Sequence, residues 1–272
     1  MQAAISRYHT PMFSFFFFAL GTIIASFVGV IVVRIHTGQG FVGGRSSCDV
    51  CGTQLSSLAL VPVISYFVGG GRARCCGARI SWYSPLTEIL LGSLFVLSYL
   101  KLGLSSDLML LLTALSLMLA LVLYDLAHQI LPTTLLTLFT MISAVTGFLL
   151  SPTSSEFVST FFVAILLALI LFAMHFFSRG RAMGFADAPF VFGLALLVGP
   201  VAFSGFVFSF WIGAVIGILI LLRRPAGTRM GVEVPFAPFL AAGFILAYFT
   251  QWTPLTIIAS LSHTILTVLG FL

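Results

Sequence analysis

The chain has 272 residues, of which 60% are hydrophobic and 7% are charged. Soluble globular proteins carry roughly a quarter of their residues as charged side chains, which excludes water as the main solvent of this chain. Its apolar runs are about twenty residues long, as a membrane-crossing α-helix requires, whereas an outer-membrane barrel shows alternating segments of about ten residues. The composition therefore predicts an all-α, polytopic integral membrane protein.

The apolar runs predict eight or nine transmembrane helices, which cover residues 13–33, 86–102, 107–124, 133–150, 158–177, 188–201, 203–222, 235–250 and 254–272. The first run continues directly into Arg34, which favours a retained anchor over a cleaved signal peptide. The run at 188–201 is short, and Trp252 and Pro254 can turn the last run back along the membrane interface. The sequence therefore leaves both counts open.

Positively charged side chains predict the orientation of the helices, because Lys and Arg near helix ends are retained in the cytoplasm. Only Arg7 and Lys101 fall on one side of the predicted helices. The other side carries Arg34, Arg45, Arg72, Arg74, Arg79, Arg179, Arg181, Arg223, Arg224 and Arg229. This places the N-terminus outside and the segments 35–85, 125–132, 178–187 and 223–233 at the cytoplasmic face of a bacterial inner membrane. Topology and attraction to anionic membrane lipid explain the net charge of +5, so no nucleic-acid partner is expected.

Residues 35–85 form the one long polar stretch. They predict a small cytoplasmic loop domain between a first transmembrane helix, residues 1–34, and a bundle formed by residues 86–272. The stretch contains all four cysteines of the chain, Cys48, Cys51, Cys75 and Cys76. A CxxC pair followed by a second pair suggests a four-thiolate zinc site. Adjacent Cys75 and Cys76 are a poorer spacing than a pair with two intervening residues, so a zinc-free loop with reduced thiols is the alternative.

Two of the seven acidic residues lie at predicted helix ends on the cytoplasmic side. Asp187 could simply cap the helix that it precedes, whereas Asp125 ends a helix, where a negative charge opposes the helix dipole. If the two carboxyl groups meet, they can share one proton, because two like charges a few ångströms apart cannot both ionise comfortably. Such a pair can activate water against a peptide bond without a cofactor.

Other polar residues offer competing chemistry. Glu88 lies in the first turn of the helix at 86–102, where we expect a structural or substrate-orienting role. No GxSxG motif accompanies His128 or His175, which disfavours a serine protease. Because acidic groups in membranes often mark ion paths, a proton- or ion-coupled transporter is an alternative function.

Several segments resemble the type IV prepilin peptidases, bacterial membrane enzymes that process pilin and pseudopilin precursors. In the family's order, they are residues 25–34, 61–66, 71–77, 83–88 and 234–239. The family's catalytic aspartates lie in a D-x-x-x-x-x-(I/L)-P context and in a GxGD motif. The resemblance therefore implies that Asp125 and Asp187 are catalytic and that Pro132 and Gly184 support them.

The resemblance implies an aspartyl endopeptidase that cleaves the leader of type IV prepilins or pseudopilins at the cytoplasmic membrane face, with the substrate's hydrophobic helix as its partner. Many members then N-methylate the new N-terminus with S-adenosylmethionine. The sequence departs from the family where Ala186 replaces the second glycine of GxGD, a restriction if that position needs positive φ. It departs again where the third family cysteine falls at Ala73. A catalytically silent scaffold for pilus assembly is therefore a further alternative, and the sequence does not predict an oligomeric state.

Overall fold

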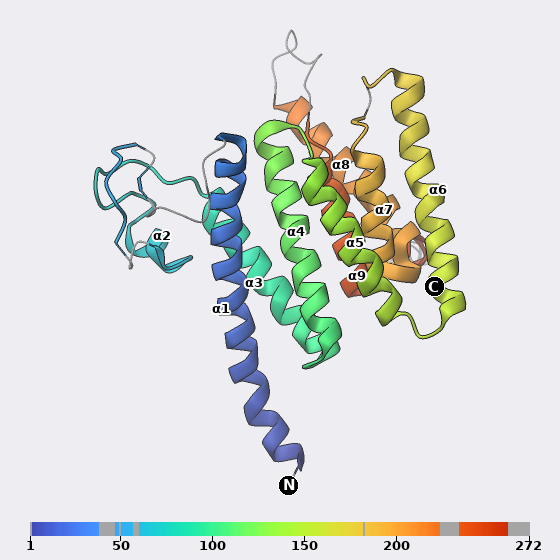
Figure 1. Cartoon of the computed structure of the whole chain (residues 1–272), viewed down its shortest axis with the longest axis horizontal. Coiled ribbons are helices and arrows are strands. Elements are labelled where there is room, and N and C mark those ends of the chain that lie inside the picture. Colours follow the sequence, from blue (N-terminus) through green and yellow to red (C-terminus); the bar gives the residue numbers. More distant parts are fainter. Residues whose placement is uncertain are drawn as a thin grey trace, which may run out of the picture. The chain divides into compact units, whose positions relative to one another are not determined.

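The computed structural model describes residues 2–37, 47–48, 50–56, 60–181, 183–223 and 234–260, which are mostly helical (Figure 1). Within these ranges, β pairing is limited to isolated bridges. The elements are α1 (Gln2–Thr37), α2 (Ile64–Val68), α3 (Tyr83–Leu102), α4 (Ser106–His128), α5 (Thr133–Leu150), α6 (Ser154–Ser178), α7 (Asp187–Val198), the short 3₁₀ helix η2 (Gly199–Val201), α8 (Ala202–Leu222) and α9 (Ala237–Thr250). The predicted all-α class is confirmed.

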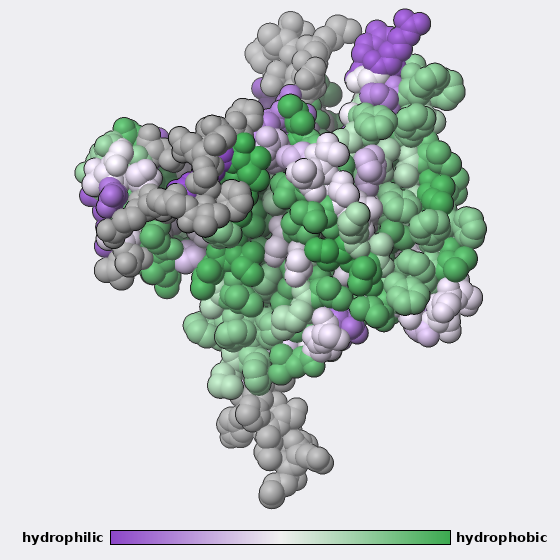
Figure 2. Space-filling view, in the orientation of Figure 1, coloured by the Kyte–Doolittle hydropathy of each residue, from purple (hydrophilic) through white to green (hydrophobic). Residues whose placement is uncertain are grey.

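Among the described residues, six helical stretches are long and apolar enough to cross a bilayer: Pro11–Ile35, Tyr83–Leu102, Ser106–His128, Thr133–Leu150, Ser154–Ser178 and Asp187–Arg223. A seventh is added if α9 and the helical turn Pro254–Ser260, which meet at 71°, form one broken span. The predicted count was eight or nine. The difference arises because Asp187–Arg223, which holds two of the predicted helices, counts as one stretch by length and composition although the chain turns back within it at Gly199. In addition, most of the run 254–272 lies outside the described residues. The helix flanks are largely hydrophobic, as a multi-pass membrane protein requires (Figure 2).

The chain forms two compact units, residues 1–123 and 124–272. In the first unit, α1 and α3 cross with their backbones in contact, because a Cβ on Gly21 would lie only 2.7 Å from the Cα of Gly92. Lipid gives helices no hydrophobic reason to associate, so close packing at small residues must hold them together. The stacked rings of Phe17 and Tyr99, with centroids 4.9 Å apart, extend the same contact.

The segment between α1 and α3 is tied to the start of α3 by Glu88. This side chain is only 5% exposed and accepts the backbone N–H of Val63 at 2.7 Å. Val63 has φ 61° and ψ −55°, a strained conformation for a β-branched residue, and it immediately precedes α2. The carboxylate of Glu88 thus holds a strained turn against the first turn of a membrane helix.

In the second unit, α8 and α9 pack in opposite directions. A Cβ on Gly205 would contact Phe244, and the Ser209 hydroxyl donates to the carbonyl of Leu240 at 3.2 Å. Further along α8, Gly213 faces Phe236 at the start of α9. As the residue numbers rise along α8, the residues of α9 that they contact have falling numbers, so the two helices are antiparallel.

The chain reverses between α7 and α8. Asp187 and Ala237, which begin α7 and α9, both lie beside Asp125, so α7 and α9 start at the same end of the unit. Since α8 runs opposite to α9, it also runs opposite to α7, and Gly199 accommodates the turn with φ +72°. At 12 residues α7 is about 18 Å long, too short to cross a hydrocarbon core of about 30 Å, and most of its side chains are buried.

Candidate functional site

Asp125 lies in the last turn of α4, and its side chain is 7% exposed. The helix stops there because Gln129 adopts a left-handed conformation with φ 55°. The C-terminal end of a helix is unfavourable for a carboxylate, but the backbone N–H of Ala237 donates to Asp125 Oδ2 at 3.1 Å. The first residue of α9 therefore supplies the hydrogen-bond donor that Asp125 lacks on its own helix.

Asp187 is the first residue of α7 and is also 7% exposed. Its Oδ2 accepts the backbone N–H of Gly184 at 3.1 Å. A Cβ on Gly184 would lie 3.3 Å from this oxygen, so the absence of a side chain allows the close approach. Ala186 has φ −72° and ψ −14°, an ordinary helical conformation. The loss of the family's second glycine therefore imposes no backbone strain here.

The two carboxyl groups lie near each other. Asp125 and His175 are both near enough to Asp187 to interact with it electrostatically. Both aspartates belong to the unit formed by residues 124–272. If these two buried carboxyl groups meet, they can share one proton, which is the arrangement that general acid–base activation of water needs.

Of the other predicted residues, Gly184 lies at the site through its hydrogen bond to Asp187. Pro132 has φ −62° and precedes α5, where it ends the turn that follows Asp125. Glu88 makes its contacts within the first unit, to Val63 and Ser84.

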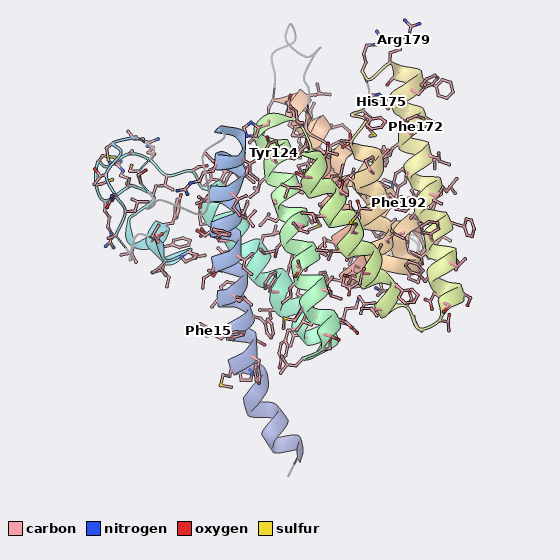
Figure 3. The ribbon with its side chains drawn as sticks, in the orientation of Figure 1. Phe15, Tyr124, Phe172, His175, Arg179 and Phe192 are labelled. Carbon is pink, nitrogen blue, oxygen red and sulfur yellow. The ribbon has the colours of Figure 1, made fainter. Side chains whose placement is uncertain are left out.

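Two features of the site were not found by sequence reasoning. The first is the backbone donor of Ala237, although it lies in the segment 234–239 that carried part of the family resemblance. The second is His175, whose Nδ1 lies 2.9 Å from the carbonyl oxygen of Met183. Figure 3 shows His175 in the last turns of α6, beside the segment that leads into α7. A single histidine near the end of an apolar helix gave no signal of this partner.

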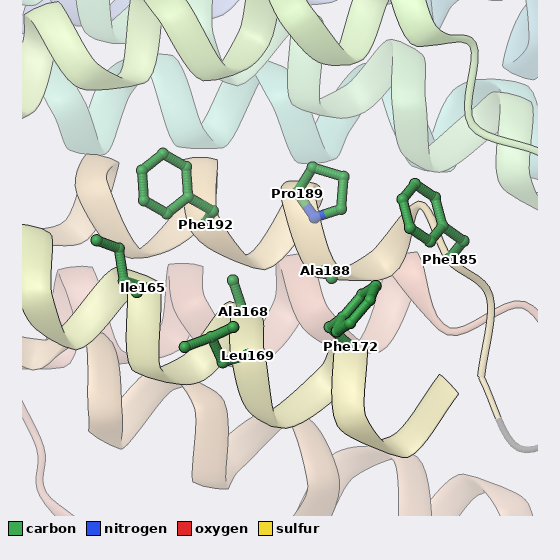
Figure 4. A pocket seen from close by; sticks show the side chains of 8 residues that line it. All are labelled: Ile165, Ala168, Leu169, Phe172, Phe185, Ala188, Pro189 and Phe192. Atoms are coloured by element: carbon green, nitrogen blue, oxygen red, sulfur yellow. The ribbon is translucent and has the colours of Figure 1, made fainter. Parts of the chain in front are cut away.

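Two mainly apolar cavities flank the start of α7. One, of about 400 Å³, lies between α6 and α7, where Phe172, Phe185 and Phe192 line it (Figure 4). The other, of about 360 Å³, lies between α5 and α7 and includes Thr137 and Thr140. Phe185 and Pro189 border both cavities, so the residues around Asp187 separate two spaces that can accept apolar groups.

The four cysteines of the first unit come together, adjacent Cys75 and Cys76 included. Their Sγ atoms all lie within 4.8 Å of one another. Cys48 and Cys76 are 3.7 Å apart, and Cys51 and Cys75 are 3.4 Å apart. A tetrahedron with zinc–sulfur bonds of about 2.3 Å has edges of about 3.8 Å, so the four thiols fit a zinc ion.

Local turns explain why the four thiols converge. Gly52 and Gly77, each following a cysteine, have φ of +70° and +72° and close tight turns through backbone hydrogen bonds. Hydrogen bonding with the side chain and backbone of Thr53 lowers the pKa of the Cys51 thiol to about 6, whereas the hydrogen bond with Cys51 raises the pKa of Cys75 to about 12. Four thiolates at these distances repel one another unless a cation lies between them.

Comparisons with known proteins identify relatives of this chain by sequence. The family model of the bacterial peptidase A24 N-terminal domain matches residues 19–102. The prepilin leader peptidase/N-methyltransferase of Bacillus subtilis is 31% identical over 235 residues, which cover 85% of this chain and 92% of the relative. The protein of the same description from Pseudomonas aeruginosa is 25% identical over 261 residues, covering 83% of this chain and 87% of the relative. The one from Myxococcus xanthus is 35% identical over 131 residues, covering 48% and 39%. No solved structure matches.

Proposed function

Because the chain belongs to the type IV prepilin peptidase family, we propose that it is an aspartyl endopeptidase that removes the leader of a type IV prepilin or pseudopilin. The observation that carries this proposal is the proximity of two buried carboxyl groups, Asp125 and Asp187, each of which accepts one backbone N–H. The positive charges of the sequence favour cleavage at the cytoplasmic face of the bacterial inner membrane.

The mechanism that we propose uses one shared proton. Like charges at short range leave one carboxyl of the pair protonated and the other ionised. The ionised carboxylate takes a proton from water as the water oxygen attacks the scissile carbonyl carbon. The protonated carboxyl donates a hydrogen bond to the carbonyl oxygen, and a proton then passes to the leaving amine as the C–N bond breaks.

The relatives' description also includes N-methyl transfer, and we propose this as a second activity, with S-adenosylmethionine as the methyl donor. The donor carries a sulfonium, a carboxylate and a nucleoside, which need polar and charged partners. The two cavities beside α7 do not fit it, because mainly apolar side chains line them. The methyl-transfer activity is therefore proposed from the family alone, and we derive no step for it.

We further propose that Cys48, Cys51, Cys75 and Cys76 bind one zinc ion that stabilises the loop between α1 and α3. The fit of their Sγ spacing to a zinc tetrahedron supports this assignment. Purified protein should contain one zinc ion per chain. Cys75→Ser should lose the metal, whereas Val50→Ala, an exposed position between the first two cysteines, should retain it. Metal content unchanged in Cys75→Ser would contradict the four-thiolate assignment.

The protease proposal is tested with purified protein in detergent and a full-length prepilin, with the product identified by its mass. Asp125→Asn and Asp187→Asn should each slow leader removal by at least about 100-fold, because each removes one half of an acid–base pair. Asp107→Asn is the matched control, since Asp107 lies in the first turn of α4, at the opposite end from Asp125.

Each alternative function predicts a different result. Cleavage at the wild-type rate by Asp125→Asn or by Asp187→Asn would refute the assignment of these two residues as the catalytic pair. Persistent binding of the prepilin without any cleavage by the wild-type protein would indicate an assembly scaffold instead. Proton flux in vesicles that Asp125→Asn abolishes, without proteolysis, would indicate a transporter.

A further inference from the structure

One peptide unit in the α6–α7 connection is held at both ends by ionisable side chains. The carbonyl of Met183 and the N–H of Gly184 belong to the same peptide bond. The carbonyl accepts from His175 Nδ1 at 2.9 Å, so this nitrogen carries the hydrogen, and the N–H donates to Asp187 Oδ2 at 3.1 Å. The result is a continuous chain of hydrogen bonds that runs from the imidazole through one amide to the carboxylate.

We infer that His175 is a positioning residue for Asp187, acting through the Met183–Gly184 peptide. This role rests on the proposed function, because it assigns a task within the same aspartate site. Since all members of the chain donate in the same direction, the bond from His175 polarises the amide and strengthens its N–H as a donor to the carboxylate. The same bond fixes the plane of the peptide and therefore the direction from which Asp187 is held.

The surroundings of His175 support a fixed geometry for this contact. α6 ends just beyond it, where Arg179 is left-handed with φ 54° and the N–H of Gly180 returns to the carbonyl of His175 at 2.9 Å. The imidazole also packs edge-on against Phe185, with centroids 5.7 Å apart. Met183 is 7% exposed, so water competes little for its carbonyl. The contact is thus built into the turn that delivers Asp187 to the site.

The chain of hydrogen bonds uses Nδ1 of the ring, which yields a test based on isosteres. The amide nitrogen of Asn occupies nearly the place of Nδ1, whereas that of Gln reaches toward the place of Nε2. We expect His175→Ala and His175→Gln to lower kcat for leader cleavage by about tenfold with KM nearly unchanged, and His175→Asn to restore most of the rate. Phe177→Ala, an 84% exposed position on the same helical turn, is the control and should cleave like the wild type.

The outcomes separate this role from the proposed function. Rates are compared below the melting temperature of each variant, so that a folding defect does not count as a loss of positioning. Wild-type rates in His175→Ala would overturn the positioning role and leave the proteolytic proposal intact. Recovery by Gln but not by Asn would also overturn it, because Nε2 would then be the working atom. A wild-type protein that leaves the precursor uncut would refute the proposed function, and the role of His175 with it.

Discussion

Gly184→Ala is expected to slow cleavage without disturbing the fold. The backbone at Gly184 lies outside the left-handed region, so alanine is conformationally acceptable there. Its Cβ, however, would lie 3.3 Å from Asp187 Oδ2 and 3.9 Å from Asp187 Cγ, which forces the carboxylate to shift by a few tenths of an ångström. A misplacement of about 1 Å can cost about 100-fold in rate, so a shift of this size corresponds to roughly three- to fivefold. Gly184→Val, with two further methyl groups against the same carboxylate, should lose more.

The assay is the initial rate of leader removal from a purified prepilin, followed by mass, with melting temperatures measured in the same detergent. Ala186→Gly is the paired variant and restores the family's second glycine. Because Ala186 already has an ordinary helical φ, the rate should stay the same, and stability should fall by about 0.5–1 kcal/mol from the extra freedom of the unfolded chain. Equal rates in the wild type, Gly184→Ala and Gly184→Val would refute the reasoning, as would a marked gain of rate in Ala186→Gly.

Three further substitutions and one control test the local structure of the two units, each by thermal unfolding in detergent. Val63→Gly should raise stability by about 1–2 kcal/mol, because glycine adopts φ 61° without the strain of a β-branched side chain; a loss would contradict the strain. Gly243→Val should lower it by about 1–3 kcal/mol, because the added Cβ overlaps Ser209 of α8, while Gly217→Ala, with open space around it, should be tolerated. Ser143→Ala should be neutral or stabilising by up to about 1 kcal/mol, because its buried hydroxyl lacks a hydrogen-bond partner among the described residues; a clear loss would reveal a partner.

Local sequence signals predicted the helices well where apolar runs coincide with helix ends. The run 133–150 matches α5, which extends from Thr133 to Leu150. The run 158–177 began too late, because α6 starts at Ser154 with Thr153 as its N-cap, and the polar first turn lacks the apolar signal used to set the boundary. Length and hydropathy thus locate the helices, whereas caps, which are short and polar, decide where they begin.

The candidate site was predicted in part. Motif contexts pointed to Asp125 and Asp187, and the structure brings them near each other. The donor to Asp125, however, comes from Ala237, a contact between residues 112 positions apart that no local pattern encodes. His175 was missed for a similar reason, since its partner is a backbone carbonyl and leaves no trace in the identity of Met183. Backbone hydrogen-bond partners depend on the path of the chain, so the identities of the side chains do not predict them.

The crossing of α1 and α3 at Gly21 and Gly92 has a consequence for the cysteine-bearing loop. No cysteine takes part in this contact, so close packing at the two glycines holds α1 and α3 together independently of the thiols. Loss of a metal ion from the four cysteines would therefore loosen the loop without separating α1 from α3. A bulky residue at either glycine would have the opposite effect: it would push α1 and α3 apart and leave the four thiols together.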